Sequence, residues 1–261
     1  MKSEERQEIL SRYRHIFESE KEYYSKTSFS SRGDFDLESE DFFRKANLQI
    51  KENLGTVKNK KILDIGCGTG ALSFYLANKG ANVTGIDLSE TSINICKKEA
   101  ERKGFTIDFK EMNAQILDFE EESFDIIVGS RVIHHLPDLE LFFIECRRIL
   151  KKKGYIVFIE PLKKNKIVEL NRKYIAPEKR TIHEHPLFFS DLMIPKRIFG
   201  NLEHSEYFLL SPLAMFFRDF LRNNKLFTAF YKILNIIEAP LTKIDFLKQY
   251  CWQTVFKCVK I

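Results

Sequence analysis

The sequence predicts an α/β fold in which a seven-stranded, mostly parallel sheet is flanked by helices, with N-terminal helices and a helical C-terminal addition as a lid. Between residues 60 and 161, short apolar runs alternate with segments of helical periodicity. Strands that are almost continuously apolar and are separated by helices are typical of a parallel sheet covered on both faces. Two later runs, Glu206–Leu210 and Cys251–Lys260, supply the remaining strands.

The elements of this core follow from local signals. Ser89 is placed to cap one helix and Gly104 to end it. Lysines 151–153 suit the last turn of another helix, where the helix dipole is negative, and Gly154 suits a left-handed cap. We expect strands at Ile62–Ile65, Asn82–Asp87, Phe105–Phe109, Phe124–Gly129 and Tyr155–Glu160, and helices at Ala71–Lys79, from Ser89 to Lys103 and from Pro137 to Lys153.

The chain divides into three parts. Residues 1–56 are polar and form an N-terminal helical cap, because Ile9, Tyr13, Ile16 and Phe17 recur at helical spacing. Residues 57–161 form the core. Residues 162–261 add substrate-side helices and the final strands that complete the sheet, and no linker separates them from the core.

Composition limits the class of protein and its partners. The 261 residues include 42 Lys and Arg against 37 Asp and Glu, a net charge of +5. This mild surplus is less than dedicated nucleic-acid binders carry, so no nucleic-acid partner is expected. The five scattered cysteines have no metal-ligand spacing and suggest reduced thiols in a cytoplasmic protein. The first residues lack the apolar core of a signal peptide, and no apolar run reaches the length of a membrane span. The sequence does not predict the oligomeric state.

The strongest local signal is the segment Leu63–Gly70, in which an apolar residue is followed by an acid and then by three glycines at every second position. A strand that ends in such a turn brings a ligand close to the backbone. Gly66, Gly68 and Ala71 also satisfy the dinucleotide pattern G-x-G-x-x-G/A. Asp64, however, would repel a pyrophosphate and attract the ammonium and sulfonium charges of S-adenosylmethionine, so the latter is the expected cofactor.

These residues and those that follow carry a family resemblance. Residues 55–161 resemble the class I S-adenosylmethionine-dependent methyltransferases, which have a Rossmann-like sheet. The resemblance rests on Leu63–Gly70, on Gly85–Ser89, on Phe124–Ser130 with its sequel Ile133–Leu136, and on the turn Leu150–Tyr155. It implies a donor site made of Asp64, Gly66, Cys67, Gly68, Gly70, Asp87, Leu88, Asn113, Ala114 and Ser130.

Three of these positions have independent support from the residues themselves. Asp87 ends its strand 21 residues after Gly66, where an acid can accept the ribose hydroxyls. Asn113 can bond the adenine edge, although the family often has Asp at this position. Ser130 ends the fourth strand, beside the point where such sheets bind ligands.

The acceptor is less constrained by the sequence. The Asn/Asp-Pro-Pro-Tyr/Phe signature of many amino-methylating enzymes is absent after the fourth strand, which favours oxygen as the acceptor atom. A hydroxyl acceptor benefits from a base, whereas a carboxylate needs none. The candidate bases are His183, His185 and His135, and the candidate substrate-binding residues are Tyr23, Tyr24, Arg131 and Glu184. No metal site is expected.

The main hypothesis is methyl transfer to a carboxylate or hydroxyl of a small-molecule or peptide natural product. Basic residues near the expected pocket favour an acidic acceptor; they are Arg131, Arg172, Lys173, Lys179 and Arg180. Two alternatives stay open: an apolar, lipid or quinone-like acceptor methylated at the membrane surface, or a non-catalytic binding module of the same fold. The Phe-rich C-terminal helices suit a substrate pocket, peripheral membrane contact or a partner, and also an ordinary core.

Overall fold

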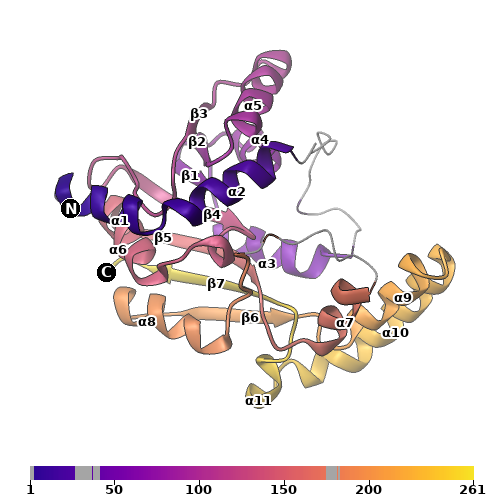
Figure 1. Cartoon of the computed structure of the whole chain (residues 1–261). Helices are drawn as coiled ribbons and strands as arrows, with labels where there is room; N and C mark the ends of the chain where they lie inside the picture. The colour runs from indigo at the N-terminus through magenta and orange to yellow at the C-terminus, as the bar shows by residue number, and fades with distance from the viewer. Residues whose placement is uncertain (1–2, 27–36, 38–41, 175–180, 182) are drawn as a thin grey trace.

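A single seven-stranded sheet organises the chain, as the sequence predicts. The computed structural model describes residues 3–26, 37, 42–174, 181 and 183–261 (Figure 1). The strand order is β3-β2-β1-β4-β5-β7-β6, and β7 runs antiparallel to both of its neighbours. The strands are β1 (Lys61–Ile65), β2 (Asn82–Asp87), β3 (Asp108–Glu111), β4 (Phe124–Ser130), β5 (Leu150–Pro161), β6 (Glu203–Tyr207) and β7 (Gln253–Val259).

The helices fall before, between and after the parallel strands. The first three are α1 (Ser3–Arg12), α2 (Arg14–Lys26) and α3 (Arg44–Leu54). Those of the core are α4 (Ala71–Asn78), α5 (Glu90–Lys103) and α6 (Leu139–Ile149). The last are α7 (Lys166–Tyr174), α8 (Met193–Phe199), α9 (Met215–Asp219), α10 (Asn224–Leu241) and α11 (Asp245–Lys248).

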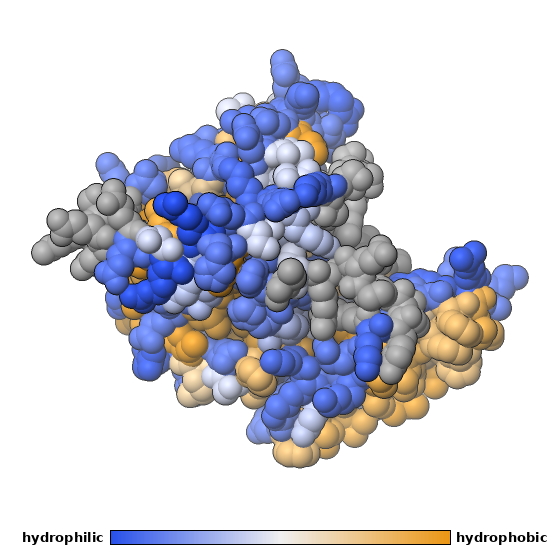
Figure 2. All heavy atoms as spheres, in the orientation of Figure 1, coloured by the Kyte–Doolittle hydropathy of each residue, from blue (hydrophilic) through white to orange (hydrophobic). Residues whose placement is uncertain are grey.

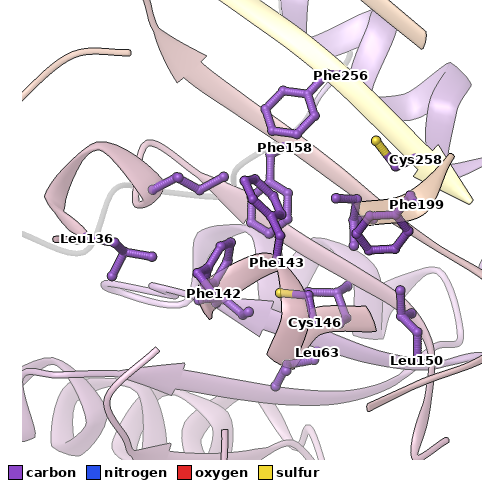
Figure 3. Packing of buried hydrophobic residues seen from close by; sticks show 14 of the residues in the cluster. Leu63, Leu136, Phe142, Phe143, Cys146, Leu150, Phe158, Phe199, Phe256 and Cys258 are labelled. Carbon is purple, nitrogen blue, oxygen red and sulfur yellow. The ribbon is translucent and has the colours of Figure 1, made fainter. Parts of the chain in front are cut away.

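One face of the sheet is covered by α6 and α8. Phe142, Phe143 and Cys146 of α6 and Phe199 of α8 pack on Phe158 of β5 in a cluster that also takes in β1 and β7 (Figure 3). The rings of Phe158 and Phe256 stack with centroids 5.9 Å apart across the β5–β7 pair. The antiparallel strand β7 therefore belongs to the same core as the parallel strands.

The other face is covered by α3 and α4. Ala46, Ile50 and Leu54 of α3 pack with Leu72 and Leu76 of α4 on the alternate residues of β1, β4, β5 and β7. The central strands β1, β4, β5 and β7 therefore bury side chains on both faces, as a doubly covered sheet requires. The first 56 residues contribute a core layer through α3 as well as the covering helices α1 and α2.

The expected end of the helix that precedes β5 is wrong. Helix α6 ends at Ile149, and β5 begins at Leu150, so lysines 151–153 lie in the strand. Lys151 Nζ bonds Asp125 Oδ1 at 3.0 Å on the neighbouring strand. Gly154 is not left-handed; a Cβ there would lie 2.9 Å from the carbonyl oxygens of Asp125 and Lys151, so the glycine permits a close approach of strands.

Other boundaries also shift. The third strand is Asp108–Glu111 rather than Phe105–Phe109, and the sixth is Glu203–Tyr207 rather than Glu206–Leu210. Pro240 lies inside α10, one residue before its end. The signals at α5 are confirmed, since Ser89 Oγ accepts from Ser92 N at 3.2 Å and Gly104 has φ 71°. The predicted basic residues Lys179 and Arg180 lie outside the described residues.

In the described ranges, no helix is long and apolar enough to cross a membrane. The five cysteines are all free and buried.

Candidate functional site

The glycine turn joins β1 to α4, and its three glycines have different roles. All three have left-handed backbones, with φ of 65° at Gly66, 53° at Gly68 and 80° at Gly70. A Cβ on Gly66 would collide with Val132 at 2.4 Å, and one on Gly70 would meet the Phe74 ring at 2.8 Å. A Cβ on Gly68 would meet no described atom within 4 Å. Gly66 and Gly70 therefore serve packing, and only Gly68 leaves open space for a ligand.

Asp64 lies within β1, just before this turn, and its carboxylate points toward α4. The side chain is 2% exposed, and its Oδ2 accepts from Ser73 Oγ at 2.6 Å. Burial, with the charge of Asp87 adding to it, raises the pKa of Asp64 to about 7 despite this bond. A cationic ligand would relieve the cost of ionising this carboxyl group.

Asp87 ends β2 beside the glycine turn. Its Oδ2 accepts from Gly68 N and its Oδ1 from Ser89 N, both at 2.9 Å. Burial raises the pKa of Asp87, and these two backbone bonds oppose the rise. Each carboxylate oxygen keeps a further lone pair, so the group can still accept hydroxyl donors from a ligand.

A pocket of about 400 Å³ lies at the ends of β2 and β3, where Leu88 follows Asp87 and Asn113 follows β3. Leu88, Met112 and Asn113 line it from the core, and Leu10, Arg14 and Phe17 line it from α1 and α2. Asn113 Oδ1 accepts from Gln115 N at 2.9 Å, which fixes the side chain in its turn. The structure thus brings together Leu88 and Asn113, two of the expected donor-site residues, and closes their pocket with the N-terminal helices.

The remaining expected donor-site residues surround the turn. Cys67 is buried, and its N–H donates to Ile86 O at 3.0 Å, which holds the turn against β2. Contact with the Cys96 thiol and burial raise the pKa of Cys67, so it is a neutral structural thiol. Ala114 packs partly buried against the α6-side core, and Ser130 ends β4 opposite Ile159.

A partly buried polar group joins the loop that follows β4 to helix α2. His135 Nδ1 lies 3.0 Å from Glu20 Oε2 of α2, and His135 Nε2 bonds Tyr24 Oη at 2.9 Å. Burial opposes ionisation of Glu20, but contacts with His135 and Thr181 and the charges of His135 and His183 outweigh it and lower the pKa of Glu20. A positive charge on His135 would also oppose the rise in the pKa of Asp87, so this group can act electrostatically on the expected donor site.

The adjacent His134 belongs to a structural network instead. Its Nδ1 bonds Glu160 Oε2 at 2.6 Å, and Glu160 Oε1 accepts the backbone N–H groups of Val132 and Ile133 at 2.8 and 2.9 Å. His134 Nε2 lies 3.9 Å from Glu184 Oε1. The expected substrate-binding residue Glu184 therefore lies next to a buried histidine that fixes the loop.

The other candidates are more dispersed. His183 meets the His15 ring with centroids 5.8 Å apart, and the His185 N–H donates to His134 O at 3.0 Å. The His185 side chain is largely exposed. The part of it that is buried is nevertheless the main cause that lowers its pKa. The Arg131 guanidinium lies 5.1 Å above the Phe43 ring, and Tyr23 contacts the Tyr24 ring edge-on.

Sequence reasoning missed Glu20, the acid that faces His135. The signal was present, because Tyr13, Phe17, Glu20 and Tyr24 recur at spacings of three and four residues on one helix face. An acid within such a partly apolar stripe needs a buried partner. The partner could not be named, since it lies 115 residues further along the chain.

The site as a whole fits the donor that the sequence predicts. The space at Gly68 admits a ligand next to the backbone, and Asp64 favours positive charge. Asp87 offers acceptors for hydroxyl groups, and the pocket at Leu88 and Asn113 suits a flat ring.

Comparison with known proteins points the same way. Residues 63–158 match the family model described as a methyltransferase domain. A ubiquinone biosynthesis O-methyltransferase of Coxiella burnetii is 38% identical over 111 residues, which cover 42% of this chain and 47% of the relative. The match thus spans about half the length of the curated relative.

Solved structures share the fold over a longer stretch. An S-adenosylmethionine-dependent methyltransferase from Mesorhizobium loti has a TM-score of 0.57 at 18% identity, over 84% of this chain and 98% of that one. Phosphoethanolamine N-methyltransferase 2 from Haemonchus contortus, in complex with S-adenosyl-L-methionine, has a TM-score of 0.61 at 20% identity, over 92% of this chain and 59% of that one. The Rossmann-like class I methyltransferase fold expected from the sequence is confirmed.

Proposed function

We propose that the chain, whose residues 63–158 match a methyltransferase domain, binds S-adenosylmethionine and methylates an oxygen atom of an apolar, quinone-like acceptor. The observation that carries the proposal is the likeness of 111 residues of the chain to a ubiquinone biosynthesis O-methyltransferase, combined with the open space at Gly68.

Each part of the donor can be assigned to particular residues of the chain. Asp64 would balance its positive charge, Asp87 would accept the ribose hydroxyls, and Leu88 and Asn113 would hold the adenine ring. When bound, the donor supplies a methyl group on a positively charged sulfur, which is already activated for displacement. The chain's own task is then to position the acceptor, exclude water and remove a proton.

The acceptor class differs from the main sequence-based hypothesis. Nothing in the comparisons supports a natural-product or peptide acceptor, whereas the relative's name supports the alternative of a quinone-like acceptor. The hydroxyl of a reduced quinone ring is weakly acidic, so its methylation gains from a base. An acidic acceptor stays a prediction.

We assign the base to the partly buried group Tyr24–His135–Glu20. In the neutral tautomer that carries its proton on Nδ1, which faces the Glu20 carboxylate, His135 would accept from Tyr24 Oη at Nε2. As the acceptor hydroxyl passes its proton to Tyr24 Oη, Tyr24 passes its own to His135, and Glu20 balances the imidazolium charge. His185 and His183, also predicted as bases, lie outside this chain of contacts and contact the loop and α2 instead.

Donor binding is tested by isothermal titration with S-adenosylmethionine and with its demethylated product. We expect heat with both and none with NAD. Binding of NAD alone would refute the assignment and return the glycine turn to the dinucleotide class.

The acceptor class is tested by turnover of a hydroxylated quinol with labelled donor. We expect label on the ring oxygen and a much lower rate for His135→Ala, with unchanged donor affinity. His185→Ala is the matched control and should keep most of the rate. Label on nitrogen or on a carboxylate, or equal loss in both variants, would contradict the assignment.

A further inference from the structure

The insertion between β6 and β7 exposes an unusual amount of apolar surface. Among the described residues, eleven of the seventeen large apolar side chains that are exposed lie between residues 213 and 246. We call these eleven the apolar face; they are Leu213, Phe216, Phe220, Leu221, Leu226, Phe230, Ile233, Ile236, Ile237, Ile244 and Phe246. Figure 2 shows them as a continuous apolar band along the edge where Figure 1 places α10 and α11.

Helix α10 buries a side of mixed polarity. Its inward side carries the rings of Phe227 and Tyr231, which pack against the core, and the polar Asn235 and Glu238, of which Asn235 is 7% and Glu238 3% exposed. Its outward side carries isoleucines, and Ile236 is 76% exposed. A surface helix of a globular protein normally buries its apolar stripe and turns its polar stripe to water. This helix therefore has an apolar side that no described part of the chain covers.

Polar groups on the inward side form hydrogen bonds that hold the helix in place. The outward orientation of the isoleucines is therefore set by specific contacts. Glu238 Oε2 accepts from the backbone N–H groups of Leu210 and Ser211 at 2.8 Å, and Glu238 Oε1 accepts from Ser211 Oγ at 2.9 Å. Tyr231 Oη donates to Phe42 O at 2.8 Å. These bonds fix the orientation of α10 relative to the sheet.

Positive charges accompany the apolar face. Arg222 and Lys225 lie at the turn into α10, Lys232 precedes Ile233, and Lys243 precedes Ile244. All four side chains are exposed, and none forms an ion pair with any residue that the structure describes. The three acids of this segment are already engaged, since Asp219 pairs with Arg218, Asp245 with Lys248, and Glu238 is buried.

We propose that the apolar face of α9–α11 docks the protein on an anionic lipid bilayer. Apolar side chains would enter the boundary of the acyl chains, and the basic residues would meet acidic headgroups at the surface. This goes beyond the proposed methyl transfer, although an apolar quinol dissolved in the membrane is the substrate that such docking would serve. A second copy of this chain is the less favourable occupant, because a symmetric contact would bring the same four cations together.

The test is flotation of the full chain with vesicles of phosphatidylcholine alone and of phosphatidylcholine mixed with phosphatidylglycerol. We expect the protein to float with the anionic vesicles and to be released by salt. Ile236→Glu should weaken vesicle binding about tenfold, equivalent to about 1.4 kcal/mol. Ile144→Glu is the matched control, because Ile144 is an exposed isoleucine on α6, and it should float like the wild type.

Donor titration of each variant separates docking from the proposed function, since Ile236→Glu should bind the donor normally. The proposal would be overturned if the wild-type protein floated with neither kind of vesicle. It would also be overturned if Ile236→Glu floated as well as the wild type. Equal binding to neutral vesicles would overturn the choice of an anionic surface. Sedimentation that shows a dimer abolished by Ile236→Glu, without vesicle binding, would assign the apolar face to a second copy.

Discussion

Replacing Asp64 by Asn should stabilise the free protein and weaken the donor. The amide has nearly the shape of the carboxyl group and can still accept from Ser73 Oγ, which lies 2.6 Å from Asp64 Oδ2. The variant therefore removes a buried charge without opening a cavity. Buried charge in a ligand-free site is costly, so the carboxylate serves binding at the expense of folding.

The magnitude follows from the pKa of Asp64, which burial raises from 3.8 to about 7. This rise corresponds to about 4 kcal/mol against ionisation in the folded chain. The folded state holds the proton more tightly than the unfolded state, so the stability of the wild type falls as pH rises between these two values. Above about pH 7 the full cost is present, and below about pH 4 it vanishes.

The assay is urea unfolding of both proteins without donor, at about pH 5 and about pH 8. The advantage of Asp64→Asn should grow by about 3 kcal/mol between these conditions. The cost of the buried charge rises by about 1.4 kcal/mol per pH unit over the roughly two units between pH 5 and the raised pKa of about 7. In parallel, the donor affinity of the wild type should rise with pH through about 7, as the carboxylate forms, and that of the variant should not.

An equal stability difference at both pH values would refute the reasoning that Asp64 is a costly buried acid. Unchanged donor affinity in the variant would refute its role toward a cation.

Three further substitutions test the site. Gly68→Ala should weaken the donor, whereas Gly104→Ala, which also lies at positive φ in open space, should lose a similar amount of stability, about 1 kcal/mol, and bind the donor normally by titration. Equal affinities would contradict the role of Gly68. Asp87→Ala should weaken the donor by roughly 1–3 kcal/mol through lost charge-assisted hydrogen bonds, and unchanged binding heat would exclude a ribose contact. Glu20→Gln should lower kcat by about 10²-fold or more and leave the donor affinity unchanged; an unaltered kcat would make Glu20 structural.

The core could be predicted because its signals are local. The apolar runs, Ser89 before its helix and the alternate glycines at 66–70 each act on their own neighbourhood, and they placed β1, β2, β4 and α5 closely. Prediction failed where a neighbouring strand decided the outcome. Lysines 151–153 have the composition of a helix end, but they lie between Leu150 and Tyr155, which both pair with β4, and Lys151 contacts Asp125 of that strand.

The sequence by itself determined the α/β class, the glycine turn and the acid before it, because spacing along a strand or helix sets which side chains share a face. Only the tertiary structure decided that Gly68 alone of the three glycines in the turn faces open space, that Glu20 meets His135 and that α10 turns its isoleucines outward. The reason is physical: periodicity defines a face of an element, but what covers that face depends on chain segments far away in the sequence.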